Sequence, residues 1–481
     1  MRRSFQIAVV CALMAVLGVG LSAAGVATAT AQPSAAENTW GVSAGASTLY
    51  YDDATLARYL DAMKNLGIRY IRADFPLNGL FPTSLQAPQW AAYDRYVAAV
   101  HSRGMEVLPI LGHTPAWARA LANYNGGIWT PWADDGAFGE ACRKIVERYR
   151  PLGVRTYQLW NEPNVAGFFG VNLTGRNVDD RDVLKYAGMV KAAYRAMKAQ
   201  AADITVLAGT AGIGYYPNLN ANLPSMDSLL YLQKLYDPSL GNWKGHFDAL
   251  SFHAYPDFSR KSGDEAYAYA AGDDFVGWNK LDETTPSVRG IMAQYGDSDK
   301  KVWLTEFGAP TTPSGAHTTE EGQRQIAEQV LGRWRLKPYA GGLMWYTGMD
   351  SGTSRTDSEE HFGLIRHDWS QKPAYAAFRN AITASSSGAS SAALPSPQPP
   401  EAAPTTSPPR AQCRVPRVVG LRLAVARARI KARGCRLGRI RRARAAHVRR
   451  TASAARVLSQ KPRRGARRHR GARVALTVVR P

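Results

Sequence analysis

Apolar residues along the chain gather in short, nearly continuous runs that alternate with longer stretches of helical period. Eight runs have the length and the β-branched and aromatic content of strands: residues 39–45, 70–75, 105–111, 155–163, 204–210, 247–256, 301–308 and 341–348. Runs without regular polar alternation are typical of a parallel sheet that is covered on both faces. The pattern therefore predicts eight buried parallel strands.

The stretch between the first two runs illustrates the helical pattern. Its apolar side chains fall on one face of a helix, at Leu56, Tyr59, Leu60 and Met63. Asp52 or Asp53 can cap the start of this helix, and Gly67 can end it.

Eight such strand and helix units over residues 38–382 predict an α/β fold, a (β/α)8 TIM barrel with loop insertions. A doubly wound open sheet is the alternative, and it would need a glycine-rich phosphate turn after an early strand. The sequence shows no such turn.

The N-terminal residues 1–31 have the pattern of a targeting signal. Arg2 and Arg3 precede an apolar run that ends in small residues, ATA at positions 29–31. This order predicts a cleavable secretory signal peptide, used by the general or the twin-arginine export route. We expect a secreted, extracellular protein with no transmembrane segment after cleavage, and the alternative is an uncleaved membrane anchor.

The charge is unevenly distributed along the chain. The net charge of the 481 residues is +22, but residues 412–481 hold 23 of the 60 Lys and Arg residues and no Asp or Glu. Residues 383–412 are rich in Pro, Ser and Ala and have no apolar period, so we expect a linker there. The sequence thus predicts a neutral barrel, a linker and a basic domain at residues 413–481.

The basic domain has the pattern of a small α+β module. A Val-Pro segment precedes a helical stretch that ends at Gly434, and a Gln460-x-Pro462 turn and the strand-like run ARVALTVV follow. Cys413 and Cys435 can pair in an oxidising compartment. This order resembles the PASTA domain, which implies peptidoglycan as a partner. The charge independently favours an anionic cell-wall polymer, and we expect no nucleic acid partner for an exported chain.

Two glutamates follow strand-like runs that are far apart in the sequence. Glu162 follows TYQLWN, and Glu306 lies in VWLTEFG. In a barrel these are the ends of strands four and seven, which meet at the catalytic rim. Two carboxyl groups across a cavity suit glycosidic bond cleavage, in which one donates a proton and the other meets the developing positive charge. We predict Glu306 as the ionised nucleophile and Glu162 as the acid and base.

Five further residues at the ends of predicted strands are candidates for substrate binding: Arg72, Asn161, His253, Tyr255 and Trp345. Arg72 and Tyr255 can hold Glu306 in its charged form through hydrogen bonds. Trp345 can stack on a sugar ring. No spacing of Cys, His and Asp resembles a metal site, so we predict neither a metal nor a cofactor.

The residues around both glutamates resemble those of clan A glycoside hydrolases. The resemblance rests on NEP at residues 161–163, TEFG at residues 305–308 and FHAYP between them, and it covers residues 38–382. The nearest families are the cellulase-like family 5 and the β-xylosidase-like family 39. The resemblance implies a retaining double displacement, with Glu162 as acid and base, Glu306 as nucleophile and the five further residues around the first sugar.

The sequence therefore predicts a secreted retaining glycosidase that cleaves β-linked O-glycosidic bonds of a poly- or oligosaccharide and carries a wall-binding module. The rival hypothesis is a carbohydrate-binding barrel that has lost catalysis and acts as a cell-wall adhesin. A third alternative is a transglycosylase. The presence of both carboxyl groups favours an enzyme.

Overall fold

The computed structural model describes residues 39–45, 47–171, 174, 176–211, 225–258, 266–267, 277–312 and 317–386, and in the C-terminal part residues 412–416, 418–419, 423, 426–427, 430, 435–443, 456–462, 467–469 and 472–479. The predicted signal peptide and residues 387–411 of the predicted linker lie outside these residues. Among the described residues, no helix combines the length and the apolar character needed to cross a membrane.

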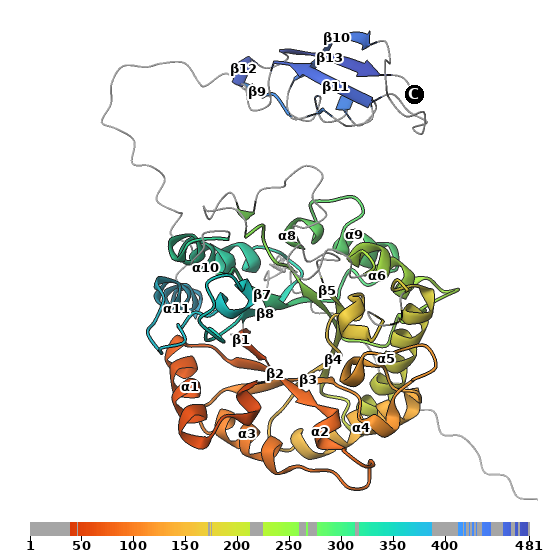
Figure 1. The fold of residues 1–481 in the computed structure, drawn as a ribbon, viewed down its shortest axis with the longest axis vertical. Coiled ribbons are helices and arrows are strands. Elements are labelled where there is room, and N and C mark those ends of the chain that lie inside the picture. The colour runs from red at the N-terminus through yellow and green to blue at the C-terminus, as the bar shows by residue number, and fades with distance from the viewer. Residues whose placement is uncertain are drawn as a thin grey trace, which may run out of the picture. The chain divides into compact units, whose positions relative to one another are not determined.

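Eight parallel strands close into a barrel (Figure 1). They are β1 (Trp40–Gly45), β2 (Tyr70–Pro76), β3 (Glu106–Gly112), β4 (Thr156–Leu159), β5 (Thr205–Ala211), β6 (Ala249–His253), β7 (Val302–Phe307) and β8 (Ala340–Tyr346). Each strand pairs with the next, and β8 pairs with β1 to close the ring. Each predicted run overlaps one of these strands, so the predicted (β/α)8 TIM barrel is confirmed.

Helices surround the strands (Figure 1). They are α1 (Asp53–Leu66), α2 (Leu77–Leu80), α3 (Ala91–His101), α4 (Asp135–Tyr149), α5 (Asp180–Gln200), α6 (Ser228–Tyr236), α8 (Gly277–Lys280), α9 (Val288–Gln294), α10 (Glu320–Arg335) and α11 (Pro373–Ser386). Short 3-10 helices lie in the connecting segments: η1 (Ser47–Tyr50), η2 (Ala116–Ala118), η3 (Gly127–Trp129), η4 (Ala166–Phe169) and η5 (Ser358–His361). Because α11 continues to Ser386, the first residues of the predicted linker are helical.

Helix α1 shows how the sequence sets these elements. The Asp52 side chain caps its start by accepting a hydrogen bond from the Thr55 N–H at 2.8 Å. Gly67 ends it at a φ of 87°, in the left-handed region that glycine adopts without strain. Its buried stripe comprises Leu56, Tyr59, Leu60, Met63 and Leu66. The predicted caps and apolar face of this helix are confirmed.

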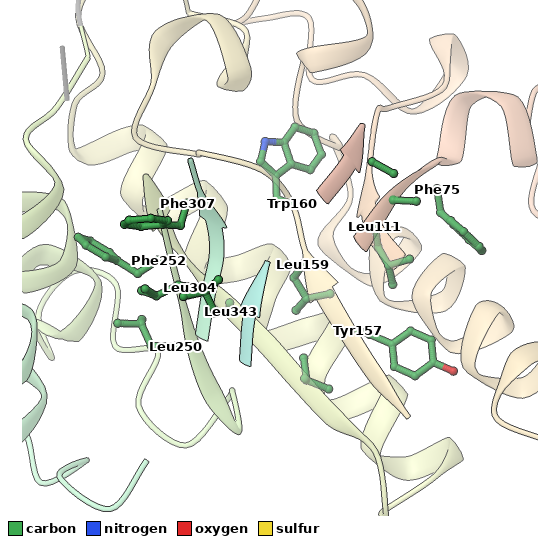
Figure 2. Close-up of a cluster of buried hydrophobic side chains, with 14 of the residues drawn as sticks. Phe75, Leu111, Tyr157, Leu159, Trp160, Leu250, Phe252, Leu304, Phe307 and Leu343 are labelled. Carbon is green, nitrogen blue, oxygen red and sulfur yellow. The ribbon is translucent and has the colours of Figure 1, made fainter. Parts of the chain in front are cut away.

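The barrel wall is packed on both faces, which explains the continuous apolar runs. Inside the barrel lies a layer of buried side chains: Tyr70, Leu108, Leu207, Ala249, Trp303 and Met344. The opposite face of the strands packs against the helices, and Figure 2 shows Phe75, Leu111, Tyr157, Leu159, Phe252 and Phe307 among these residues. Cys142 of α4 is fully buried in this outer core.

The C-terminal part forms two small sheets. In the first, β13 (Arg473–Val479) lies between β10 (Arg436–Ala443) and β11 (Arg456–Lys461), and in the second β12 (Arg467–His469) pairs with β9 (Gln412–Arg414). A disulfide joins Cys413 to Cys435. The apolar side chains Val474, Leu476 and Val478 of β13 are buried, as the alternating run at this end of the chain predicts.

Candidate active site

A pocket of about 260 Å³ opens at the carboxyl ends of the barrel strands. Five of the seven residues that the sequence singles out line it: Arg72, Asn161, Glu162, Tyr255 and Glu306. His253, at the end of β6, is buried and contacts both glutamates. The barrel therefore brings six of the predicted residues together, across more than 230 positions of sequence.

The position of Glu162 depends on a sharp turn after β4. This strand ends at Leu159, and Trp160 and Glu162 then adopt positive φ values of 64° and 47°. Such left-handed conformations are strained for residues with a side chain. The buried Trp160 ring anchors the turn, because its Nε1 donates a hydrogen bond to the Phe168 carbonyl at 2.7 Å. The turn directs the Glu162 side chain into the pocket.

Glu306 reaches the pocket through an irregularity in β7. The pairing of β6 with β7 shifts between Phe252 and His253, and His253 lies opposite Glu306. Thr305 faces the interior, where its Oγ1 lies 2.6 Å from the Ser251 Oγ. In a regular strand the next side chain would point toward the helices, because successive residues alternate. The bulge turns Glu306 back toward the pocket.

Arg72 is the polar centre of the barrel interior and is only 1% exposed. Its guanidinium donates hydrogen bonds to Gln158 Oε1, Ser43 Oγ and Asn161 Oδ1, each at 2.8 Å, and to Glu306 Oε1 at 2.7 Å. These contacts connect the ends of β1, β2, β4 and β7. A buried cation with this many partners holds its neighbours in one arrangement.

The two glutamates lie close together beside His253 and Tyr255. His253 Nδ1 is 2.7 Å from Glu162 Oε1 and 3.3 Å from Glu306 Oε2. The Tyr255 hydroxyl donates a hydrogen bond to Glu306 Oε2 at 2.8 Å. One oxygen of each carboxyl group and a ring nitrogen of His253 all lie within 4.8 Å of one another. The two carboxyl groups therefore face the same small volume.

The surroundings of Glu306 favour its charged form. Burial alone would raise the pKa of its carboxyl group. Electrostatic interactions with His253 and Arg72, together with hydrogen bonds from Tyr255 and Arg72, outweigh burial and lower this pKa. An ionised carboxylate held by fixed donors is suited to act as a nucleophile.

Tyr255→Phe should move the acidic limb of the pH–activity profile to higher pH. The Tyr255 hydroxyl favours the charged form of Glu306, so its removal raises the pKa of that carboxyl group and protonates Glu306 at a higher pH. The measurement is kcat/KM against pH for the wild type and the variant. An acidic limb that stays in place in a folded variant would contradict this role of Tyr255.

Glu162, His253 and Glu306 are also close enough to ligate a small cation. However, the Arg72 guanidinium lies 2.7 Å from Glu306 and adds a positive charge at the same place. This charge opposes a metal ion, so the group is better suited to proton transfer and nucleophilic attack than to metal binding.

The prediction that Trp345 stacks on a sugar ring is wrong. Its side chain is fully buried, packs against Phe307 and Phe378, and donates a hydrogen bond from Nε1 to the Phe362 carbonyl at 3.2 Å. It therefore offers no ring face to a sugar. The alternation of β8 places the neighbouring Tyr346 in the pocket instead.

Several pocket residues are absent from the sequence predictions: Asp74, Trp129, Phe168, Tyr346, Glu359 and Phe362. Burial raises the pKa of Asp74, which follows Arg72 by two positions on the inner face of β2. Desolvation, followed by repulsion from Glu306 and Glu162, raises the pKa of Glu359 to about 7. The alternation of β2 around Arg72 could have indicated Asp74, whereas the loop residues carry no comparable signal.

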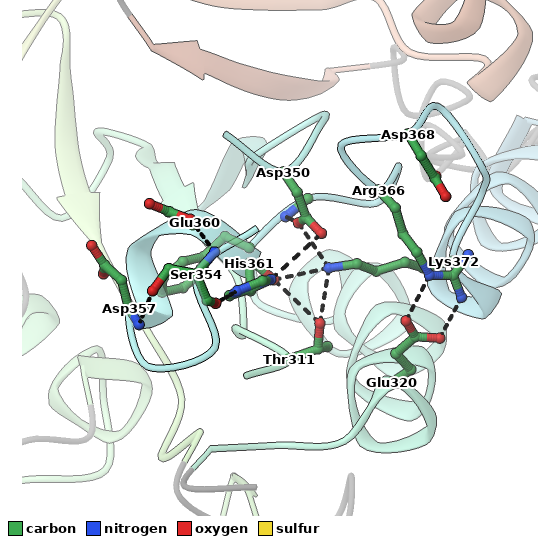
Figure 3. A network of polar contacts seen from close by, with 12 residues as sticks. Thr311, Glu320, Asp350, Ser354, Asp357, Glu360, His361, Arg366, Asp368 and Lys372 are labelled. Atoms are coloured by element: carbon green, nitrogen blue, oxygen red, sulfur yellow. Dashed lines mark hydrogen bonds and ion pairs between the residues drawn. The ribbon is translucent and has the colours of Figure 1, made fainter. Parts of the chain in front are cut away.

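A buried lysine fixes the loop that presents Glu359 and Phe362 (Figure 3). Lys372 Nζ donates hydrogen bonds to Thr311 Oγ1, Asp350 Oδ1 and the His361 carbonyl, at 2.9, 2.8 and 2.9 Å. Thr311 follows β7, whereas Asp350 and His361 follow β8. The lysine therefore joins the loop after β7 to the loop after β8, which carries the pocket residues Glu359 and Phe362.

Several solved structures similar to this chain are glycoside hydrolases. A family 39 glycoside hydrolase from Bacteroides cellulosilyticus WH2 aligns with a TM-score of 0.51, 21% identity and coverage of 72% of this chain and 63% of that chain. A monomeric beta-xylosidase from Caulobacter crescentus CB15 has a TM-score of 0.51, 19% identity and coverage of 71% and 67%. At these identities the similarity shows the fold alone. This chain spans a little under two thirds of the first of these proteins.

A third similar structure is the GH5_18 protein from Streptomyces cattleya in complex with GlcNAc, with a TM-score of 0.50, 17% identity and coverage of 73% of this chain and 81% of that chain. A comparison with curated proteins gives no match.

The sequence profile described as Cellulase (glycosyl hydrolase family 5) matches residues 32–334. The match spans β1 to β7 and both pocket glutamates. It confirms the predicted glycosidase class and, of the two families that the motifs resemble, it identifies family 5. Because the match covers more than half of the sequence, the chain belongs to the cellulase family of glycoside hydrolases, glycosyl hydrolase family 5.

Proposed function

We propose that this chain is a secreted retaining glycosidase that hydrolyses β-linked O-glycosidic bonds of a poly- or oligosaccharide. The proposal is supported above all by the spacing of Glu162 and Glu306, which have carboxyl oxygens within 4.8 Å of each other. Retaining glycosidases hold their two carboxyl groups about 5 Å apart, whereas inverting enzymes need roughly 6.5–9.5 Å to admit a water molecule.

In the first step, the Glu306 carboxylate attacks the anomeric carbon, and the bond to the leaving oxygen breaks. Glu162 donates its proton to that oxygen, and Glu306 becomes a glycosyl ester. In the second step, Glu162 takes a proton from water, the resulting hydroxide oxygen bonds to the anomeric carbon, and the ester breaks. Arg72 and Tyr255 stabilise the charged Glu306 carboxylate before the attack. They stabilise it again when hydrolysis of the ester regenerates it.

The test of this proposal is a screen of the full chain against aryl β-glycosides and polysaccharides, with mass analysis of the products. Release of the aryl group with the β-anomer as the first sugar product supports retention. Binding without any hydrolysis would overturn the proposal in favour of an adhesin. Transfer of the sugar to an added acceptor, with no hydrolysis, would identify a transglycosylase instead.

For residues 413–481 we propose binding to the cell wall, through peptidoglycan or an anionic wall polymer, in a PASTA-like module. Exposed side chains of this part include the cations Arg427, Arg436, Arg439, Arg441, Lys461 and Arg473. With no acidic residue in this stretch, nothing within it neutralises their charge.

Deletion of residues 412–481 should abolish retention of the protein on isolated cell walls. Because the attraction is between exposed charges, retention of the full chain should also weaken as salt screens it. Co-sedimentation with walls at low and high salt measures both effects. Equal retention of the full and shortened chains would contradict the proposed role of this stretch.

A further inference from the structure

A buried ion pair holds the backbone beside the pocket residue Phe362. Lys372 and Asp350 are only 2% and 4% exposed, and their side chains meet at 2.8 Å. Neither is among the described residues that line the pocket. Burying two charges costs free energy that two apolar side chains would not cost. The reaction steps derived above do not explain this cost, because none of them uses the pair.

The pair fixes the chain on both sides of Phe362. Lys372 Nζ donates a hydrogen bond to the His361 carbonyl at 2.9 Å (Figure 3), and the Gly363 N–H donates to Asp350 Oδ1 at 2.7 Å. Gly363 lies so close to Asp350 that a Cβ on Gly363 would be 2.2 Å from the Asp350 nitrogen. Because both of its neighbours are held, Phe362 has a fixed backbone position.

Phe362 packs in turn against Tyr255. The two buried rings lie with their centroids 5.9 Å apart and their planes at 69°. The Tyr346 ring packs against both of them, with centroid distances of 5.2 Å to Phe362 and 6.4 Å to Tyr255. The Tyr255 hydroxyl donates its hydrogen bond to Glu306 Oε2 at 2.8 Å. Since close-packed side chains transmit displacements, the position of Phe362 determines how well this hydroxyl meets Glu306.

We propose that Lys372 is a positioning residue, which acts through Phe362 to hold the Tyr255 hydroxyl against Glu306. This inference rests on the proposed function, in which Glu306 is the nucleophile. Without the lysine, the His361 carbonyl loses its donor, Phe362 gains freedom and the hydrogen bond from Tyr255 weakens. Because that bond favours the charged form of Glu306, its weakening raises the pKa of the carboxyl group.

Other charged and titratable groups also face Glu306. They are Arg72 and Asp74 of β2, Glu162 after β4, His253 of β6, Tyr346 of β8 and Glu359 in the loop after β8. Lys372 makes its three hydrogen bonds to other residues, so its replacement removes none of these groups. Glu359 lies in the loop that the lysine holds, and its movement is the alternative route to Glu306. The experiment must therefore separate Tyr255 from Glu359.

The test measures the acidic limb of kcat/KM against pH in a double-mutant cycle of Lys372→Met and Tyr255→Phe. Lys372→Met should move the limb to higher pH, by no more than Tyr255→Phe moves it. When Tyr255 is already Phe, the lysine change should add no further shift, because the hydroxyl on which it acts is gone. An unmoved limb would overturn the proposal. Equal shifts in both backgrounds would also overturn it, since the effect would then come through Glu359.

Lys280→Met is the matched control, because Lys280 is also a buried lysine, 5% exposed, and pairs with Asp227 at 2.7 Å. It is not among the described residues that line the pocket, and its replacement should lower the melting temperature without moving the limb. A shift as large as that of Lys372→Met would overturn the proposal.

Should Lys372→Met fail to fold, the cycle is measured with Lys372→Met/Asp350→Leu. Replacing both partners of the buried pair by apolar residues leaves no unpaired charge, and the limb should again move to higher pH only when Tyr255 is present. Absence of any hydrolysis by the wild type would instead overturn the proposed function.

Discussion

Glu306→Gln should lower kcat/KM at least about 10⁴-fold, because the carboxylate proposed to form the glycosyl ester is lost. Gln keeps the size of the side chain and can still accept a hydrogen bond from Tyr255, so we expect the fold to persist. The measurement is the initial rate on the best aryl glycoside, together with the melting temperature of the variant.

The matched control for this prediction is Glu328→Gln, the same change on the exposed face of α10, where Glu328 pairs with Arg324. The control should retain wild-type activity. An active Glu306→Gln variant, or an inactive control, would contradict the assignment of Glu306 as the nucleophile.

Glu162→Gln should produce a loss that depends on the leaving group. With an alkyl or sugar leaving group, kcat/KM should fall by about 10²–10⁴-fold, the usual contribution of a general acid. With a dinitrophenyl leaving group, which departs without a proton, kcat/KM should change little. Turnover of that substrate should still slow, because hydrolysis of the glycosyl ester lacks its base. Rapid mixing should then show a burst of released dinitrophenol followed by a slow phase.

The control for this experiment is azide rescue of Glu162→Ala. The shorter side chain leaves room for a small anion, which can attack the glycosyl ester without a general base. Azide should raise turnover of the dinitrophenyl glycoside and give the β-glycosyl azide. Equal losses on both classes of leaving group, with no rescue, would show that Glu162 supports the fold and does not transfer protons.

The sequence predicts the barrel well because most strands are buried on both faces and the longer helices have an apolar stripe. Because the runs are apolar at nearly every position, the sequence does not show which side chains of a strand face the barrel interior. Trp345 and Tyr346 are adjacent apolar positions in β8, and no polar alternation distinguishes them, so the sequence points to the wrong one.

The candidate catalytic residues that the sequence predicts lie at strand ends, where barrel geometry makes their convergence predictable. The sequence does not show the local backbone geometry that directs each side chain into the pocket. Glu306 depends on a bulge in β7, and Glu162 depends on two residues with positive φ. Trp129 and Phe168 lie in loops whose paths are set by close packing between Gly126 and Gly170, which no local pattern reveals.

Covalent trapping of the nucleophile tests the central claim most directly. A 2-deoxy-2-fluoro glycoside with a dinitrophenyl leaving group forms the ester but slows its hydrolysis, because the fluorine destabilises the positively charged transition state. Mass spectrometry of the digested protein should then find one sugar, attached to the peptide that contains Glu306. A label on any other residue, or no label on an enzyme that turns over the parent glycoside, would contradict the account.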